Sequence, residues 1–352
     1  MNKRPPRNGE IVEKKQNTLL IDGNALFKVG YFGAKDAYNH RGEHIGGLFS
    51  FLTILRKVLT EDLYHRVYVF WDGNFSGKLR YEIYQPYKSS RGKDYKNGTH
   101  PIDESELRQR RMVWEYLNDM YIRQIKHEVV ESDDFIAYYC LNKKKNEKIT
   151  ICTHDRDFCQ LISDDVRIYF LDLKVYVDSS NYSSYFCHHQ ENSVLLKILA
   201  GDTSDTIKGV KGLGESKLLS LFPLLKERRM TLDEILDSAK KQQEERIEKK
   251  QKPLKVLTNI IDKVTDGPQG EKLYEINERL VNLKKPMITN DAIQELEHLI
   301  EGTLDSSGRE LKNVFMMMKR DGLDKQMGEE RFNEYLIPFK KLIDREKFFI
   351  ND

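Results

Sequence analysis

Short apolar runs alternate with longer segments of helical periodicity along the first half of the chain. Residues 18–21, 66–71 and 149–152 are apolar runs typical of buried strands. Between the first two, leucines at 48, 52, 55, 59 and 63 have the spacing of one helix face, and we expect a glycine-rich loop before them. A strand, a helix and a second strand in this order predict a right-handed crossover within a parallel sheet.

The second half of the chain reads mainly as helices. Two short runs at 166–171 and 174–177 predict a strand hairpin, after which an apolar helix is expected at 191–200. The mixed-charge run within 226–252 predicts a solvated helix, with partner binding as the alternative. Further helical patterns, which we expect to support the packing, lie at 273–283, 291–300 and 332–343, and an earlier helical pattern lies at 104–121.

Acidic side chains follow each predicted core strand. Asp22, Asp72 and Asp155 come directly after, or just past, the three apolar runs. Because the carboxyl ends of parallel strands share one edge of a sheet, we expect these side chains to lie on the same rim. The acids at 131, 133, 134 and 157 fall at a predicted helix start and just past the third strand. Such close charges repel unless a hard divalent cation neutralises them. The alternative is that they are ordinary helix-dipole partners and turn formers.

Residues 78–111 have a different character, with few aliphatic side chains. Tyrosines at 81, 84, 87 and 95 alternate with the basic residues Lys78, Arg80, Lys88, Arg91, Lys93 and Lys96. Cations interleaved with planar rings suit a segment that holds a nucleic-acid strand by phosphate contact and stacking. A solvated loop is the alternative interpretation. Since the segment follows Asp72, we expect it to lie over the acidic rim.

A glycine-punctuated segment follows the predicted helix at 191–200. It reads GDTSDTIKGVKGLGESK, with Asp202 and Asp205 ahead of the glycines. Glycines let the backbone approach phosphates closely, and a following helix start supplies N–H donors. This pattern predicts a helix–hairpin–helix that holds duplex by shape and charge; the residues concerned are Gly209, Lys211, Gly212, Gly214 and Lys217.

Composition narrows the class of protein. The 352 residues carry a net charge of +2, although 32% are charged, which suits a protein that holds both metals and phosphate. No apolar run is long enough to span a bilayer. Residues 1–17 are basic without an apolar centre, which predicts a flexible leader and not a secretory signal. Four cysteines without disulfide or zinc spacing predict a reducing, cytoplasmic location.

The nine acids together exceed what one metal ion needs. Beside a basic aromatic segment and a duplex-binding hairpin, they indicate two magnesium ions acting on a phosphodiester. Carboxylate and water oxygens suit such hard cations, and the sequence offers no paired imidazole or soft sulfur site.

Five blocks of the sequence now carry a family resemblance. IDGNALF, VFWDGNFSGKLR, ESDDFIAYY, CTHDRDFCQLI and GDTSDTIKGVKGLGESK resemble the signature blocks of the structure-specific 5′ nucleases (flap endonucleases). The chain looks closest to the bacteriophage RNase H and flap endonuclease branch and to the 5′ nuclease domain of DNA polymerase I. The resemblance implies an α/β fold with a mostly parallel, PIN-like sheet flanked by helices at 18–190, a helical arch at about 75–111, and a helical region with the hairpin at 191–352.

The resemblance also implies roles for individual residues. Asp22, Asp72 and Asp133 would hold a first Mg²⁺, with Glu131 acting through water. Asp155, Asp157 and Asp202 would hold a second, with Asp134 and Asp205 in outer shells, and Mn²⁺ would substitute. Lys88 and Arg91 would be catalytic arch cations beside the metal-binding acids. DNA would contact Gly46, Gly47, Arg80, Lys93 and Lys96 as well as the hairpin, where a K⁺ ion is implied.

The activity implied is a 5′→3′ exonuclease and flap endonuclease that removes primers during replication. Its substrates would be branched or 5′-ended duplex DNA and RNA/DNA hybrid. Partners would be a single-strand-binding protein, a sliding clamp or a polymerase, and the chain would be a monomer in the bacterial host cytoplasm if it comes from a bacteriophage. Departures from the family pattern are Thr206-Ile207-Lys208, His154 and Arg156. The alternatives are a PIN-type endoribonuclease and a non-catalytic nucleic-acid-binding scaffold.

Overall fold

The computed structural model describes residues 16–92, 94–95, 97–98, 103–302, 310–327 and 334–349. At its centre, six strands in the described part of the chain form one sheet in the order β3-β2-β1-β4-β5-β6. Neighbouring strands are parallel except β6, which pairs antiparallel with β5. The strands are β1 (Gln16–Asp22), β2 (Arg66–Asp72), β3 (Arg123–His127), β4 (Glu147–Thr153), β5 (Val166–Phe170) and β6 (Val175–Val177). The predicted α/β fold and mostly parallel sheet are confirmed.

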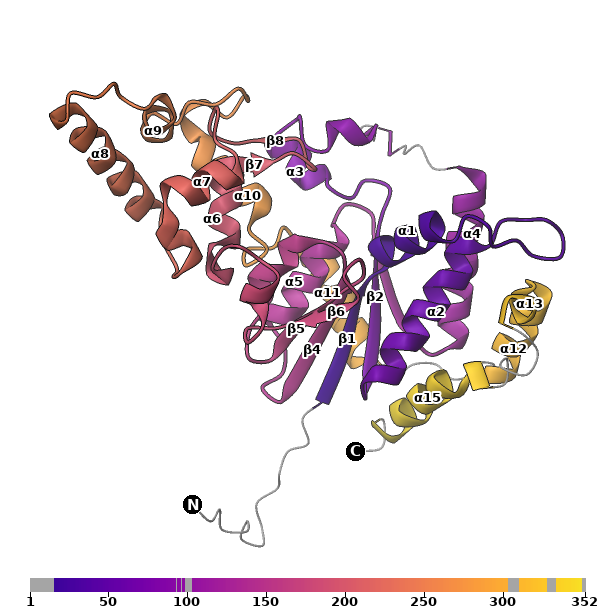
Figure 1. Ribbon diagram of the computed structural model, residues 1–352. Coiled ribbons are helices and arrows are strands. Elements are labelled where there is room, and N and C mark those ends of the chain that lie inside the picture. The colour runs from indigo at the N-terminus through magenta and orange to yellow at the C-terminus, as the bar shows by residue number, and fades with distance from the viewer. Residues whose placement is uncertain are drawn as a thin grey trace, which may run out of the picture.

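Helices cover both faces of this sheet (Figure 1). In β1, Leu19 and Ile21 face one apolar cluster and Leu20 faces the other, as the two-residue period of a strand requires. The first cluster lies under α1 (Gly23–Gly33), α2 (Gly46–Glu61) and α4 (Glu104–Asp119). The second lies under α5 (Ser132–Leu141) and α11 (Asn290–Glu301). Since both faces are covered, the central strands read as continuous apolar runs.

Helix α1 corrects the expectation of a glycine-rich loop after the first strand. Asp22 caps it by accepting a hydrogen bond from the Ala25 N–H at 2.9 Å. Gly30 within it serves close packing, because a Cβ there would lie 2.7 Å from the Ser50 Cβ in α2. The two helices therefore approach each other more closely than larger side chains would allow.

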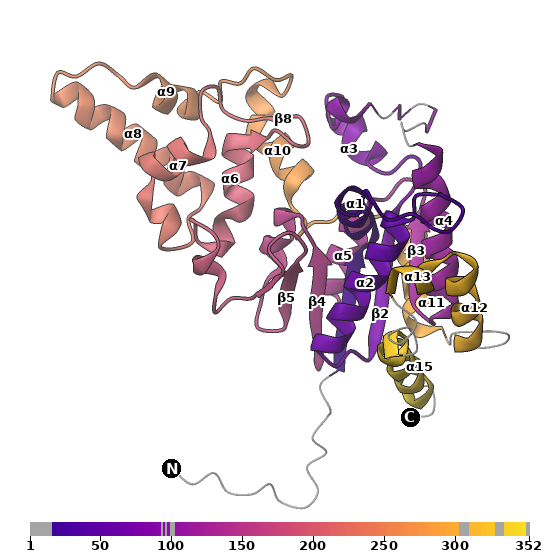
Figure 2. The same cartoon turned by 45° about the vertical axis from the view of Figure 1, so that its right-hand side comes forward.

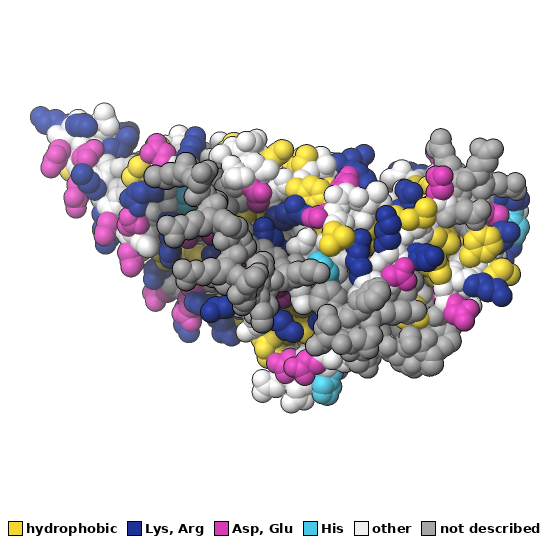
Figure 3. Space-filling view, turned by 90° about the horizontal axis from the view of Figure 1, so that it is seen from below, with side chains coloured by type: hydrophobic (Ala, Val, Ile, Leu, Met, Phe, Trp, Pro, Cys, Tyr) yellow, Lys and Arg dark blue, Asp and Glu magenta, His cyan; other side chains and the backbone are white. Residues whose placement is uncertain are grey.

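A third apolar cluster lies to one side of the sheet (Figure 2). It joins helices α6 (Ser193–Ala200), α7 (Glu215–Leu221), α8 (Leu232–Glu248), α9 (Lys255–Ile261) and α10 (Leu273–Val281). A two-stranded ribbon, β7 (Gly201–Asp202) with β8 (Ile207–Lys208), precedes α7. Helix α8 projects away from the sheet, and Figure 3 shows basic and acidic side chains interspersed over this arm. The predicted solvated helix within 226–252 is confirmed.

The C-terminal helices return to the sheet, as the expected supporting role requires. Leu296 of α11 packs in the second cluster, while Val314 and Phe339 pack in the first. The helices concerned are α12 (Leu311–Arg320), α13 (Leu323–Met327) and α15 (Ile337–Phe349). The predicted leader, except for Gln16 and Asn17 in β1, lies outside the described residues. Among the residues that are described, none of the helices has the length and apolar character needed to cross a membrane.

Candidate active site

Three neighbouring strands end in acids at one edge of the sheet. Asp22 ends β1, Asp72 ends β2, and Asp155 follows β4. The strand registers align these ends, with Asp22 opposite Phe70 and Ile21 opposite Cys152. Thr153 donates a 3.0 Å hydrogen bond to Asp22, and the Ser132 N–H at the start of α5 donates to Asp72 at 2.9 Å. The common acidic rim predicted from the sequence is therefore confirmed.

Four of the acids at this rim repel one another. Burial and the charges of Asp72 and Asp155 raise the pKa of Asp22 to about 7, although the Ala25 N–H opposes the shift. Burial and the charges of Asp22 and Asp155 also raise the pKa of Asp133 well above its usual value. Within the described ranges, none of these four carboxylates forms an ion pair with a lysine or arginine. The rim thus holds four acids close together without an ion-pair partner among the described residues.

Around this centre, a second set of acids is neutralised by cations. Lys197 of α6 forms ion pairs with Asp157 and with Asp202, the latter at 2.6 Å. Although burial opposes the shift, Lys197 lowers the pKa of Asp202 to about 2. Burial and the charge of Asp155 raise the pKa of Asp157 to about 7, against the effect of Lys197. Lys197 was not predicted from the sequence; its signal is a single charge within the otherwise apolar helix SVLLKILA.

Glu131 and Asp134 share a buried arginine. Arg80, in helix α3 (Lys78–Ile83), binds Glu131 at 2.6 Å and both oxygens of Asp134 at 2.6 and 2.9 Å. Its Nε donates to the Leu280 carbonyl, and only 4% of the residue is exposed. This placement corrects the expectation that Arg80 contacts DNA, because its donors are used inside the protein. Lys88 also pairs with Glu131; despite burial, Lys88 and Arg80 lower the pKa of Glu131 to about 2.

The base of the predicted arch is fastened to the segment after β7. The Lys88 N–H donates to the Asp205 carbonyl at 2.9 Å, and Arg91 binds the Asp205 carboxylate at 2.6 Å. Ser90 lies 3.3 Å from the Thr206 hydroxyl. Thr206 has φ +62°, a conformation in which a β-branched residue is strained. Lys88 and Arg91, in or next to the short 3₁₀ helix η1 (Ser89–Arg91), are thus held beside the acids.

The tyrosines of this segment differ from the expected stacking platform. Tyr84 and Tyr87 are 2% exposed and pack in the third apolar cluster, while Tyr95 is buried and stacks on Tyr81 at 4.8 Å between ring centroids. The regular spacing of these tyrosines reflects packing within the base of the arch. From the sequence alone, such packing cannot be told apart from a surface on which nucleic-acid bases stack. Lys93 and Lys96 lie outside the described residues.

Gly46 and Gly47 are also buried, contrary to the expected contact with DNA. The Gly47 N–H donates to Gln109 of α4 at 2.8 Å, and a Cβ there would lie 2.7 Å from the Phe27 ring. A Cβ on Gly46 would lie 2.1 Å from the Ala34 carbonyl oxygen. These glycines allow α1, α2 and α4 to pack together at the side of the site.

The glycines of the predicted hairpin fall into two groups. Gly209 approaches the backbone of Ala200 so closely that a Cβ would lie 2.2 Å from its carbonyl carbon. Gly212, at φ +76°, and Gly214, which precedes α7, have open space around them. Lys217 donates to the Gly212 carbonyl at 2.9 Å, and Lys211 pairs with Asp266 at 2.6 Å. Gly212 and Gly214, on either side of the buried Leu213, are exposed and therefore available to a ligand.

The donors at the rim fit hard divalent cations in type, since all are carboxylate oxygens. No three Asp, Glu, His or Cys groups among the described residues are gathered into a ready ligand shell, so the side chains would adjust on binding. Arg156, one of the departures from the family pattern, forms an ion pair with Asp172 and lies over the Phe170 ring.

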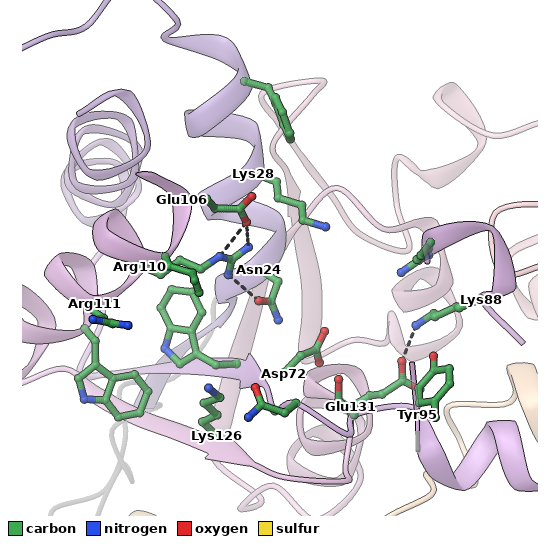
Figure 4. Close-up of a pocket in the computed structure, with 18 of the residues that line it drawn as sticks. Asn24, Lys28, Asp72, Lys88, Tyr95, Glu106, Arg110, Arg111, Lys126 and Glu131 are labelled. Atoms are coloured by element: carbon green, nitrogen blue, oxygen red, sulfur yellow. Dashed lines mark hydrogen bonds and ion pairs between the residues drawn. The ribbon is translucent and has the colours of Figure 1, made fainter. Parts of the chain in front are cut away.

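A cavity of about 780 Å³ opens beside the acids (Figure 4). Its walls come from α1, α4, the ends of β2 and β3, and the arch base. Asp72 and Glu131 line it together with Lys88 and Arg91, so a ligand in this cavity reaches Asp72 of the acidic rim and the arch cations.

The fold and the site together define a class of protein, namely an α/β protein whose open, mostly parallel sheet carries carboxylates along one edge. A basic segment is held next to this edge, and an exposed glycine turn lies in the helical region. Residues 17–189 match the family model of the 5′-3′ exonuclease, N-terminal resolvase-like domain. Residues 17–189 therefore form a domain of the 5′-3′ exonuclease family.

Two relatives show how far the similarity extends. The thermostable DNA polymerase I of Thermus caldophilus is 30% identical over 213 residues, 60% of this chain and 24% of the polymerase. This chain thus spans about a quarter of that protein. A 5′-3′ exonuclease of Mycoplasmopsis pulmonis is 25% identical over 281 residues, 80% of this chain and 82% of the relative.

Solved structures share the fold. The T5 5′-exonuclease with bound divalent zinc ions has a TM-score of 0.54 and 17% identity, covering 87% of this chain and 100% of its own. A bacteriophage T5 flap endonuclease in a complex with DNA and metal ions has a TM-score of 0.53 and 17% identity, covering 94% and 100%.

Proposed function

We propose that the protein is a divalent-metal-dependent 5′→3′ exonuclease and flap endonuclease that hydrolyses phosphodiesters at the 5′ ends and flaps of DNA. The observation that carries the proposal is the uncompensated group of Asp22, Asp72, Asp133 and Asp155, beside arch cations that are held in place. Four carboxylates without a cationic partner are stable together only when a cation or protons neutralise them.

Each group of residues has a role in this proposal. The four central carboxylates, with Asp157 and Asp202, would hold two Mg²⁺ ions, and Mn²⁺ would substitute. Bound metal would supply positive charge to the phosphate and activate the attacking water. Asp134 acts through Arg80, which it holds against Glu131. Lys197 holds Asp157 and Asp202 close together and favours the ionised form of Asp202.

Lys88 is the chain's own electrostatic contribution to the reaction. Its backbone is fixed by Asp205 and its ammonium lies against Glu131 at the edge of the cavity. A preorganised cation beside developing negative charge lowers the barrier without reorganising at the moment of reaction. Arg91, half-exposed next to it, would bind an adjacent phosphate.

Substrate binding is assigned to the hairpin and to the cavity. The open backbone at Gly212 and Gly214, with Lys211 and Lys217 near it, would bind duplex phosphates without reading bases, and a K⁺ ion could be held there. RNA/DNA hybrid and primer removal belong to the same proposal, as do a single-strand-binding protein, clamp or polymerase as partners. A relative described as a flap endonuclease was solved with DNA.

Replacement of Asp155 by Asn tests the function. We expect cleavage of a 5′-labelled flap in Mg²⁺ to fall by at least about 10²-fold, while duplex affinity stays within a few-fold. Asp164 is an exposed acid just before β5, so Asp164→Asn is the matched control and should cleave normally. Unchanged cleavage by Asp155→Asn would contradict the proposal.

Replacement of Lys88 by Ala tests the mechanism. Single-turnover cleavage should fall by about 10²–10³-fold with little change in the dissociation constant, because Lys88 meets the phosphate mainly during reaction. Exposed Lys148 on β4 provides the control Lys148→Ala. A large loss of affinity with an unchanged single-turnover rate would overturn this role. Preference for single-stranded RNA over a flapped duplex would instead favour an endoribonuclease.

A further inference from the structure

The segment that carries Asp155 and Asp157 has an unusual conformation. It is the six-residue 3₁₀ helix η2 (Arg156–Leu161), and the Asp155 carboxylate caps its start by accepting the Asp157 N–H at 2.8 Å. Runs of 3₁₀ helix longer than three or four residues are uncommon, because their hydrogen-bond geometry is poorer than that of an α-helix. We therefore expect contacts with other parts of the chain to hold η2 in place.

The side chain of Gln160 ties η2 to the segment that follows α10. Gln160 is 3% exposed; its amide nitrogen donates to the Val281 carbonyl at 3.1 Å, and its amide oxygen accepts the Leu283 N–H at 2.8 Å. Val281 and Leu283 are buried as well. An apolar side chain in place of Gln160 would leave these two backbone groups buried without their side-chain partner, which is costly.

The segment after α10 is itself fixed relative to Lys197. Helices α6 and α10 lie side by side (Figure 2), and the buried Asn277 of α10 donates to the Ile198 carbonyl of α6 at 3.0 Å. Lys197, the residue before Ile198, forms the ion pair with Asp157. The contacts therefore close a ring, which runs from Gln160 through α10 and α6 back to Asp157 in the same 3₁₀ helix.

A second glutamine holds the other end of η2. The half-buried Gln190 donates to the carbonyls of Cys159 and Ile162, at 3.2 and 2.6 Å. It begins the short 3₁₀ helix η4 (Gln190–Asn192), which leads directly into α6. Both amides thus tie η2 to the helical region that also carries the hairpin.

We propose that Gln160 is a positioning residue for the second metal position, where it sets how Asp155 and Asp157 lie relative to Asp202. Gln160 acts only through η2, since its amide is used by the backbone of the segment after α10. Loss of a group that orients metal ligands typically weakens metal binding or activity by about 10–100-fold. The inference rests on the proposed function and deepens it, because it names a residue that shapes the metal position without being a ligand.

The full-length variant Gln160→Met tests this role, with Gln243→Met as the matched control. Gln243 of α8 is 8% exposed and pairs with the backbone in the same way, donating to the Leu254 carbonyl at 3.1 Å and accepting the Leu254 N–H at 2.9 Å. It lies in the arm that projects away from the sheet and the acids (Figure 1). Because both variants lose two hydrogen bonds to the backbone, urea unfolding in EDTA should show a similar loss of stability.

Metal binding should separate the two variants. Mg²⁺ that binds the folded state raises the urea midpoint, so the Mg²⁺ concentration needed for a fixed rise reports affinity without any turnover. A tenfold loss at one of two positions raises this concentration about threefold, which we expect for Gln160→Met, whereas Gln243→Met should behave as the wild type does.

Cleavage gives a second comparison. The single-turnover rate on a saturating flap should fall by about 10–100-fold in Gln160→Met and stay within twofold in Gln243→Met. Flap affinity in EDTA should stay within twofold in both variants, since neither glutamine contacts the substrate in the proposed function. In an Asp202→Asn background, where the second position is already impaired, Gln160→Met should lower the rate by a smaller factor than it does in the wild type.

The outcomes separate this inference from the proposed function. Equal behaviour of Gln160→Met and Gln243→Met in Mg²⁺ and in cleavage would show that Gln160 acts only through packing and would overturn its role. If Gln160→Met does not fold, Gln190→Met decides: it should reproduce the metal and rate effects, and an unchanged Gln190→Met would overturn the role. Failure of the wild type to cleave any 5′-ended substrate would overturn the proposed nuclease activity, whereas the Mg²⁺ dependence of stability would still decide whether Gln160 positions the acids.

Discussion

Replacement of Asp22 by Asn should stabilise the metal-free protein at alkaline pH. The carboxyl is buried, and repulsion from Asp72 and Asp155 adds to burial in raising its pKa to about 7 from the ordinary value of 3.8. The Asn side chain keeps the acceptor for the Ala25 N–H and removes the charge. Ionised Asp22 therefore lowers the stability of the metal-free protein, and the residue is retained for its role in the site.

The size and pH window of the effect follow from linkage. Because the pKa is raised on folding, the protonated carboxyl favours the folded state; this contribution is complete below about pH 3.8 and is lost as the pH rises through about 7. Each pKa unit corresponds to about 1.4 kcal/mol. Relative to low pH, titration of Asp22 therefore lowers the free energy of unfolding by about 4 kcal/mol at pH 8 and by about 2 kcal/mol at pH 5. The advantage of Asp22→Asn should thus be about 2–3 kcal/mol larger at pH 8 than at pH 5.

Urea unfolding of both proteins in EDTA at pH 5 and pH 8 measures this difference. Constant effects of the amide cancel between the two pH values, so only the titrating charge remains. Asp164→Asn is the control, and its difference from the wild type should stay within about 0.5 kcal/mol at either pH. Adding Mg²⁺ at pH 8 should stabilise the wild type more than Asp22→Asn. An Asn variant whose advantage does not change with pH would refute the account of the acidic centre.

Three further substitutions test the surroundings of the site. Lys197→Met leaves two acids without their cation, so its unfolding free energy in EDTA should be about 1–3 kcal/mol lower than that of the wild type. Adding Mg²⁺ should raise the unfolding free energy of this variant more than that of the wild type. Equal stability of the two proteins in EDTA would contradict this. Arg80→Ala should lower the unfolding free energy by about 3–5 kcal/mol through its two buried carboxylate partners, whereas a change in DNA affinity alone would restore the binding role. Gly47→Ala should cost about 1–3 kcal/mol in a urea titration because of the contact with Phe27; a neutral effect would show that the helices adjust.

The sheet was predictable wherever its strands are buried on both faces. Residues 18–21, 66–71 and 149–152 are apolar runs, and the structure places them side by side as β1, β2 and β4. Strand β3 was missed because RQIKH is polar at every second position or more, as suits an edge strand. Helix α1 was missed because its glycines read as loop formers, although Gly30 serves tertiary packing against α2.

The acids of the rim were predictable because each is tied to a local signal, the end of a strand or the start of a helix. Their counter-charges were not. Arg80 looks like its basic neighbours in the sequence, but it is buried between segments around Glu131 and Leu280, far away in the chain. Lys197 reaches Asp157 across 40 positions of sequence. Such pairings depend on tertiary structure, which residue type and spacing do not encode.

The distribution of these counter-charges explains where a metal would act. The outer acids Glu131, Asp157, Asp202 and Asp205 each pair with a lysine or arginine from the arch or from α6. The four central carboxylates have no such partner within the described residues, and burial together with mutual repulsion raises the pKa of Asp22 to about 7 and that of Asp133 well above its usual value. A divalent cation that enters the centre displaces protons, whereas at Asp157 and Asp202 it competes with Lys197. We therefore expect the position at Asp157 and Asp202 to be the one at which Lys197→Met strengthens metal binding.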